Sequence, residues 1–399
     1  MATRKILRFD DKETRETGLG RNRRDRLAPI RDVFESWVAT LSQSFIPYEN
    51  VTVDEQLVGF RGHCPFRQYM KSKPAKYGIK LWALCDSSTS FALNMQVYTG
   101  KRAGDPPEKN QGERVVRDLI EVIKGSGRNV TMDNFFTSVP LARHLLSKKL
   151  SLVGTLRKNK SDIPVEFLPN RDRVVNDTLF GHQENLTLVS YVPKKGKSVI
   201  LLSSMHTDAQ ISNREDKKPE IILDYNRSKG CVDTLDQMVE TYSTKRKSRR
   251  WPMVLFYNIL DVSAVNAFII WSHVNPQWNA KKTHRRRLFL KQLGKDLVYN
   301  HLTSRLSIPG LSLMLKTTIH ECIEQQHESQ GDARDDATQN NYEEQNNGHG
   351  GADNAVRKRK QGRCILCDRS KDKKSRTTCH RCGSFACADH LVALCTGCA

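Results

Sequence analysis

The sequence has far fewer acidic than basic residues, and this imbalance limits the kinds of partner that the protein can bind. It carries 44 Asp and Glu against 65 Lys and Arg in 399 residues, a formal net charge of +21. Nine of the acids lie between 321 and 353 with one Arg, so the rest of the chain carries +29. Such a basic body fits a polyanion, most often nucleic acid, although a merely basic surface is the alternative.

Long apolar runs are also missing. Residues 1–20 contain no apolar core, so no secretory signal is predicted. The most apolar long segment, 251–274, is interrupted by Asn258, Asp261 and three further polar residues. These interruptions favour a buried helix over a membrane span, and we expect no membrane partner.

Cysteine is scarce until the last 36 residues, which contain seven of the eleven. Without a secretory signal, clustered CxxC pairs favour metal over disulfides, which remain the weaker alternative. The spacing is Cys364-x2-Cys367-x11-Cys379-x2-Cys382-x4-Cys387-x2-His390-x4-Cys395-x2-Cys398. Eight ligands allow two structural zinc ions, and metal binding would supply the folding energy of so small a domain.

Two pairings of these ligands are open. Alternate pairing assigns Cys364, Cys367, Cys387 and His390 to one ion and Cys379, Cys382, Cys395 and Cys398 to the other. That interleaving resembles the cross-brace of RING and PHD domains, whereas sequential pairing would divide the ligands in chain order. A cross-brace could bind DNA, histone tails or a ubiquitin-conjugating enzyme.

Apolar periodicity predicts a mixed sheet flanked by helices. The predicted order is strands at 51–60, 78–84 and 90–98, a helix at 112–124, a strand around Asp133, a helix at 139–148 and a strand at 151–157. Three strand-like runs, LTLVSYV, SVILLSS and EIILDY, predict a β-rich insertion at 161–222. Further helices are expected at 28–45, 231–244 and 252–273.

Asp133 is difficult to explain locally, because Asp is depleted in strands and costly near a core. Asp54 lies in the first predicted strand and Asp133 in the fourth, and these two strands can lie side by side. Asp233 and Asp236 lie three residues apart on one helical face. Convergent carboxylates suit two Mg²⁺ or Mn²⁺ ions and phosphoryl transfer, although caps or first-turn helix charges would explain single residues.

Several blocks, in this order, resemble the piggyBac family of DNA transposases. They include NVTVDEQLVGFRGHCPFRQYM, NVTMDNFFTS, YNRSKGCVDTLDQM and RRWPMVLFYNIL, and they extend over nearly the whole chain. The resemblance implies an α/β, RNase H-like catalytic core with a β-rich insertion, helical DNA-binding and dimerisation segments, and a C-terminal zinc domain. It also implies that Asp54, Asp133 and Asp233 are catalytic metal ligands, with Asp236 a further catalytic acid.

The resemblance divides the chain into seven parts. They are a partial helical dimerisation and DNA-binding segment (1–48), the first part of the core (49–160), the insertion (161–222), the second part of the core (223–240), a helical dimerisation and DNA-binding segment (241–320), a disordered acidic linker with a basic end (321–360) and the zinc domain (361–399). The resemblance begins part way through the family's first helical domain, which argues against efficient transposition.

The implied chemistry is cut-and-paste transposition by a homodimer in the nucleus. Strand cleavage at the transposon ends, hairpin formation and strand transfer into TTAA targets are all phosphoryl transfers on double-stranded DNA. The alternative is a domesticated DNA-binding or chromatin protein without transposition. The basic run 357–360 is a candidate nuclear localisation signal.

Basic residues cluster beside each predicted catalytic aspartate, where they can bind phosphates without reading sequence. Trp251 could stack on distorted DNA or be buried at a helix start. The predicted DNA contacts are Arg61, Lys76, Lys80, Arg157, Lys160, Arg249, Arg250 and Trp251.

Overall fold

The computed structural model describes residues 7–10, 25–101 and 108–324, and near the C-terminus positions 362–363, 367, 374–377, 385 and 387. The chain divides into two units, Met1–His301 and Leu302–Ala399. In the second, β10 (Gly362–Arg363) pairs antiparallel with β11 (Lys374–Ser375).

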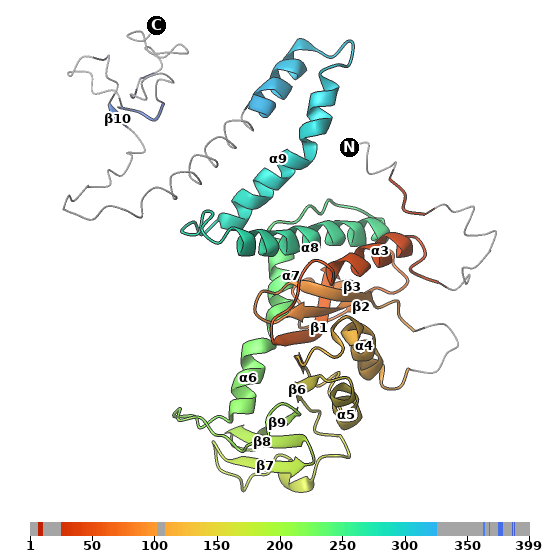
Figure 1. Ribbon diagram of the computed structural model, residues 1–399, viewed down its shortest axis with the longest axis vertical. Coiled ribbons are helices and arrows are strands. Elements are labelled where there is room, and N and C mark those ends of the chain that lie inside the picture. The colour runs from red at the N-terminus through yellow and green to blue at the C-terminus, as the bar shows by residue number, and fades with distance from the viewer. Residues whose placement is uncertain are drawn as a thin grey trace. The chain divides into compact units, whose positions relative to one another are not determined.

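A mixed sheet forms the centre of the first unit (Figure 1), in the order β2-β3-β1-β5-β6-β9-β8-β7. Strand β4 lies off this path and also pairs with β3. Strand β1 is antiparallel to β3 and parallel to β5, and β5 is parallel to β6. The strands are β1 (Asn50–Gly59), β2 (Gln68–Tyr69), β3 (Tyr77–Asp86), β4 (Ala92–Val97), β5 (Asn129–Met132), β6 (Ser151–Thr155), β7 (Thr178–Gln183), β8 (Leu186–Lys194) and β9 (Lys197–Ser203).

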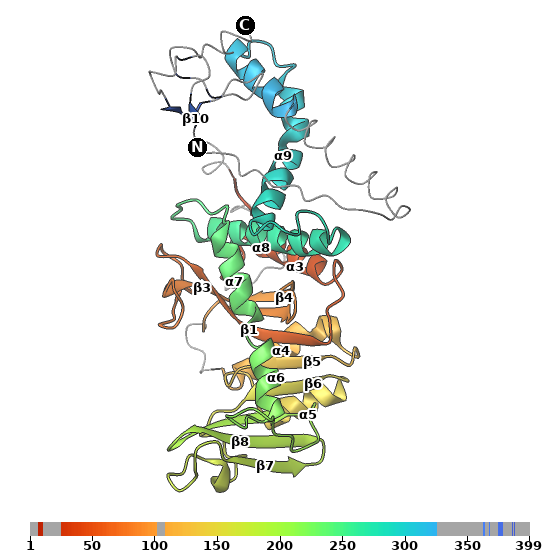
Figure 2. The same ribbon diagram turned by 90° about the vertical axis from the view of Figure 1, so that its left-hand side faces the viewer.

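Helices cover both faces of this sheet. Helices α4 (Gln111–Leu119), continued by the 3₁₀ turn η1 (Ile120–Ile123), and α5 (Val139–Ser147) lie on one face. Helices α6 (Glu220–Ser228) and α7 (Cys231–Thr241) lie on the other, as Figure 2 shows. Because both faces are covered, the central strands are buried almost continuously, as expected for parallel strands.

The insertion strands extend the main sheet. β9 pairs antiparallel with β6, and β8 and β7 follow in a meander. A short 3₁₀ turn, η2 (Val165–Phe167), precedes β7, and Ser190 Oγ donates to Phe167 O at 2.7 Å. The sheet therefore continues without a break from the central strands into residues 178–203.

Helix α8 (Trp251–Val274) is long and apolar enough to cross a membrane by length and composition, but its polar residues bind core partners. Asn258 Nδ2 donates to Gln56 Oε1 at 3.1 Å, and Asp261 Oδ1 accepts from Thr244 N at 2.7 Å. Asn266 pairs with both backbone groups of Ala92. These contacts suit a core helix, and α3 (Arg31–Leu41) and α9 (Arg285–Arg305) also pack against it.

Most of the predicted elements are confirmed, with three differences. The prediction of a strand at EIILDY is wrong, because residues 220–228 form α6 with Ile221 and Ile222 buried. Apolar residues at 221, 222 and 225 also fit a helical face, and Pro219 lies at the N-cap. Asp133 follows β5 instead of lying within it, and the strands β2 and β7 were not predicted.

Gly154 in β6 allows the turn after β5 to pack closely. A Cβ at this position would lie 2.2 Å from Thr137 Oγ1 and 2.8 Å from Met132 O. Thr137 Oγ1 in turn donates to Asp133 O at 2.8 Å. Overpacking here would therefore disturb the turn that carries Asp133.

We expect Gly154→Ala to lower the free energy of unfolding by about 2 kcal/mol, because the added methyl cannot be accommodated without moving that turn. Denaturant titration at fixed pH measures the change. Gly294→Ala in α9 is the matched control, since no atom lies within 4 Å of its Cβ position and alanine favours helix. Equal stability of the two variants would contradict this account of the turn.

Candidate functional site

Asp54 and Asp133 lie side by side because of the register between β1 and β5. The parallel pairs run from Asn50–Asn129 to Val53–Met132, and the next residues on the two strands are Asp54 and Asp133. Adjacent strands are about 4.8 Å apart, and residues in register point to the same face. Residues 79 positions apart in sequence thus present carboxylates at one point.

The junction between α6 and α7 brings Asp233 to the same face. Thr52 Oγ1 donates to Ser228 O at 2.8 Å, and Thr131 Oγ1 lies 2.7 Å from Ser228 Oγ. Thr52 and Thr131 are two residues before Asp54 and Asp133, so they share their face. The anchored junction continues through Gly230 into the first turn of α7, where Asp233 lies.

These elements enclose a pocket of about 260 Å³. Three of the four predicted catalytic aspartates line it, together with one tyrosine and one lysine that were not predicted. The lining residues are Thr52, Val53, Asp54, Met132, Asp133, Tyr225, Lys229, Gly230 and Asp233. The pocket thus brings Asp54, Asp133 and Asp233 together from three separate segments.

Each of the three carboxylates has one close hydrogen-bond donor. Asp54 Oδ1 accepts from Glu55 N, and Asp133 Oδ1 from Phe135 N, both at 2.8 Å. Asp233 Oδ1 accepts from Lys73 Nζ at 2.6 Å. Asp233 is a first-turn residue and not the N-cap of α7, which is Gly230.

Burial makes the ionised forms of Asp54 and Asp133 costly. Together with the charges of Glu55 and Asp133, it raises the pKa of Asp54 from 3.8 to about 7, against the backbone N–H of Glu55 and the charge of Lys73. Burial also raises the pKa of Asp133, against the N–H of Phe135 and the charge of Arg157. A cation near these carboxylates would therefore lower the cost of their ionisation.

Asp236 lies apart from this pocket, facing a second cavity of about 830 Å³. Burial raises its pKa to about 6, although Lys73 and Gln56 act in the opposite direction. Five basic residues also line that cavity, beside two further acids and several apolar residues: Arg61, Lys245, Arg246, Lys247 and Arg249. Asp236 thus lies one turn along α7 from Asp233 and lines a different cavity.

The carboxylates have the chemistry of a magnesium or manganese site, since these ions prefer oxygen ligands. Glu55 Oε2 is a further buried oxygen without a hydrogen-bond partner, and it lies close enough to raise the pKa of Asp133. Within residues 7–10, 25–101 and 108–324, however, no three acidic, histidine or cysteine side chains are close enough together to hold an ion. Asp233 is engaged by Lys73, so a shared ion would require that side chain to turn.

Two of the predicted DNA contacts, Lys80 and Arg157, flank the aromatic ring that follows Asp133. Lys80 Nζ lies 4.9 Å and Arg157 Cζ 5.6 Å from the centroid of Phe135. Both charges act to lower the pKa of Asp133. Phe135 thus positions two cations beside the carboxylate pocket, where they could bind a phosphate.

The other predicted contacts are more dispersed. Arg61 and Arg249 line the second cavity, and Lys76 is exposed at the turn before β3. Lys160 is half-buried after β6, and Arg250 donates to Leu7 O at 3.0 Å. Trp251 packs edge-on against Phe66 at 5.0 Å, which fits the alternative of a tryptophan buried at a helix start.

Four residues of the pocket region were missed as site residues. Tyr225 and Lys229 come from the run predicted as a strand and its continuation, and Lys229 Nζ lies over the Tyr225 ring. Glu55 follows Asp54 directly, and Lys73 lies in a turn nineteen residues later. Helical spacing within 220–229 could have found the first pair, but no local pattern indicated the position of Lys73.

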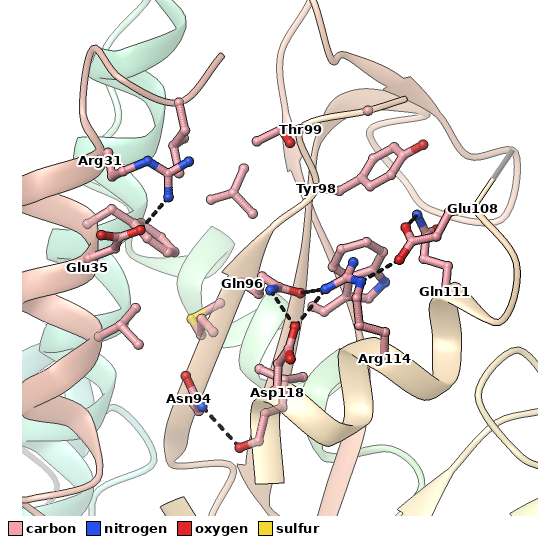
Figure 3. Close-up of a pocket in the computed structure, with 18 of the residues that line it drawn as sticks. Arg31, Glu35, Asn94, Gln96, Tyr98, Thr99, Glu108, Gln111, Arg114 and Asp118 are labelled. Atoms are coloured by element: carbon pink, nitrogen blue, oxygen red, sulfur yellow. Dashed lines mark hydrogen bonds and ion pairs between the residues drawn. The ribbon is translucent and has the colours of Figure 1, made fainter. Parts of the chain in front are cut away.

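A larger cavity of about 910 Å³ lies away from the carboxylates, between α3, β4 and α4. Figure 3 shows its polar network, in which Arg114 contacts Glu108, Asp118 and Gln96. Arg31 pairs with Glu35 on the opposite wall. Because its acids and bases pair with each other, this cavity shows no preference for a ligand charge.

Six of the eight predicted zinc ligands lie outside the described residues: Cys364, Cys379, Cys382, His390, Cys395 and Cys398. The other two, Cys367 and Cys387 of the second unit, have their Sγ atoms 3.6 Å apart. The linker beyond residue 324, including the basic run 357–360, also lies outside the described residues.

Comparisons with known proteins place the chain among transposase-related sequences. A family model described as Transposase IS4 matches residues 4–268. The chain is 25% identical over 225 residues to human piggyBac transposable element-derived protein 3, covering 52% of this chain and 38% of that protein. It is 21% identical over 261 residues to human piggyBac transposable element-derived protein 2, covering 61% and 44%.

A solved structure is similar over almost the whole chain. The cryo-EM structure of the piggyBac transposase synaptic complex with hairpin DNA has a TM-score of 0.72 and 36% identity, and covers 98% of this chain and 78% of that one. By contrast, the chain spans less than half the length of the two human relatives.

The raised pKa of Asp54 predicts how stability without divalent metal changes with pH. Its folded-state pKa of about 7 exceeds the ordinary value of 3.8, so the folded state binds more protons between these values. The contribution of Asp54 to stability is therefore fully present below pH 4 and is lost as pH rises through 7. We expect Asp54→Asn to match the wild type near pH 4 and to be about 4 kcal/mol more stable at pH 8.

Urea unfolding in EDTA at several pH values measures this difference. Asp172→Asn, at an exposed position before β7, should leave the unfolding free energy within about 0.5 kcal/mol of the wild type throughout. A wild-type advantage over Asp54→Asn at pH 8 would contradict the assigned burial cost.

Proposed function

The chain belongs to the piggyBac-type transposase family, and we propose that it is a DNA transposase whose reaction centre is formed by Asp54, Asp133 and Asp233. The observation that carries this proposal is the pocket in which β1, β5 and α7 present these carboxylates together. The strand order β4-β3-β1-β5-β6, with the last three parallel, supports an RNase H-like core.

The residues at the pocket fit the divalent cations that a DDE-type transposase uses. Asp54 and Asp133 would hold an ion between β1 and β5, and Asp233 would complete the ligand set from α7. Once bound, such ions stabilise the attacking and leaving oxygens of an in-line phosphoryl displacement. The high pKa of Asp54 supports this assignment, because an adjacent cation would relieve the cost of its ionisation.

The chain's own residues would position the DNA. Lys80 and Arg157 beside Asp133 are placed to bind the phosphate of the reacting strand, and Arg61 and Arg249 could bind flanking phosphates. Asp236 borders that basic cavity, so we assign it an indirect role through Lys73 and Gln56.

We propose the family's reaction course for this chain. It consists of cleavage at the transposon ends, hairpin formation and strand transfer into TTAA targets by a nuclear homodimer. The similar solved structure supports the hairpin step, since it is a synaptic complex with hairpin DNA. The basic run 357–360 supports nuclear import.

A second candidate function is DNA or chromatin binding by a domesticated derivative. The similarity to two human element-derived proteins favours it. Terminal inverted repeats and TTAA flanking the gene would favour the transposase, and a single genomic copy without them would favour the derivative.

We expect Asp133→Asn to reduce Mn²⁺-dependent nicking of a transposon-end duplex by at least about 10³-fold, because it removes a ligand at the reaction centre. Binding of the same duplex should persist, as measured by gel shift. Asp208→Asn, at an exposed turn after β9, is the control that keeps its nicking rate. Nicking by Asp133→Asn at the control rate would refute the assigned centre.

We also propose two structural zinc ions in the C-terminal domain, paired alternately. The 3.6 Å separation of Cys367 and Cys387 supports a shared ion, because two thiolates at 2.3 Å from one tetrahedral zinc lie about 3.8 Å apart. Sequential pairing would assign these two residues to different ions.

Zinc released by denaturation should amount to two ions per chain. Alternate pairing predicts that Cys367→Ser, Cys387→Ser and the double variant each lose the same ion and retain one. A double variant that retains no zinc, beside single variants that each retain one, would indicate sequential pairing. Cys322→Ser, an exposed cysteine outside the domain, should retain both ions.

A further inference from the structure

Lys73 projects into the acidic region from a tight turn between β2 and β3. Backbone hydrogen bonds from Lys73 N to Met70 O and from Lys76 N to Lys73 O define this turn. The side chain of Lys73 is 12% exposed, whereas that of its partner Asp233 is 66% exposed. The lysine side chain is therefore enclosed by its neighbours, whereas the Asp233 side chain lies on the solvent-exposed side of the pocket.

The ammonium group joins β1 to α7. Lys73 Nζ donates to Glu55 O at 2.7 Å and to Asp233 Oδ1 at 2.6 Å. It also interacts electrostatically with Asp54 and Asp236. One positive charge thus serves acids from two of the elements that form the carboxylate pocket, β1 and α7.

This arrangement has a direct electrostatic reason. Three carboxylates that converge on one pocket repel each other, and a buried ammonium is stable only when it is paired. Lys73 supplies the positive charge to Asp233 while the chain is free of metal. A divalent cation shared by Asp54 and Asp233 would need the same Asp233 oxygens.

We propose that Lys73 is an internal counter-ion, a positioning residue that holds Asp233 at the pocket until a divalent cation takes over that carboxylate. This inference rests on the proposed function, because it assumes that Asp233 binds the cation. The ammonium and the cation compete for Asp233. Removal of the ammonium therefore destabilises the metal-free chain and tightens cation binding.

A purely structural lysine has a different consequence. If Lys73 only tied the turn to α7, its loss would loosen α7 and scatter the carboxylates, and cation binding would weaken. The direction of the change in affinity therefore separates the two roles.

The test is Mn²⁺ binding by the full chain, followed by the electron paramagnetic resonance signal of free Mn²⁺. Lys73→Met removes the charge, and Lys73→Gln removes it but can still donate to Glu55 O. We expect both to lower the Mn²⁺ dissociation constant by about tenfold, the effect of a hydrogen bond to a charged group. Lys73→Arg keeps the charge and should bind Mn²⁺ as the wild type does.

Lys71→Met is the matched control, because Lys71 is exposed in the same turn. It should bind Mn²⁺ as the wild type does. In EDTA, the two neutral variants should unfold at lower urea concentration than the wild type and the control, and saturating Mn²⁺ should remove the difference. Unchanged or weaker Mn²⁺ binding by both neutral variants would overturn the inference.

Asp133→Asn separates this inference from the proposed function. If the wild type and Asp133→Asn bind Mn²⁺ equally, the assigned metal centre fails, and the role of Lys73 fails with it. If Asp133→Asn weakens binding but the neutral Lys73 variants do not tighten it, the metal centre stands and the counter-ion role is wrong.

Discussion

The parallel pairing of β1 with β5 is the constraint on which the site depends. Its register places Asp54 beside Asp133, and the threonines two residues earlier bind Ser228 at the end of α6. A shift of one residue in either strand would turn its aspartate to the opposite face. The pairing and the helix junction therefore set the position of all three carboxylates of the pocket.

This arrangement costs stability. Burial raises the pKa of Asp54 and Asp133, and each carboxylate has one close donor, a backbone N–H or the Lys73 ammonium. A chain selected for stability alone would place apolar side chains here. Under the proposed function, the unfavourable charge prepares the pocket for a divalent cation and a phosphate.

Much of the fold could be predicted because its elements have regular apolar spacing. β1, β3, β4 and the helices α4, α5, α7 and α8 agree with the predicted segments to within a few residues. The error at 220–225 arose because EIILDY is short and apolar enough to suit either a strand or a helix. Residues packed against the sheet settled it, since Ile221 and Ile222 contact β8 and β9 side chains in a small core cluster.

The sequence by itself determined the acids, the basic excess, the cysteine spacing and the family, because residue identities and short spacings are local properties. Only the tertiary structure decided which acids meet. It placed Asp236 at a different cavity from Asp233, packed Trp251 on Phe66, and brought Lys73 to Asp233 across 160 residues. Such contacts depend on strand register and helix packing between distant segments, and no local pattern encodes them.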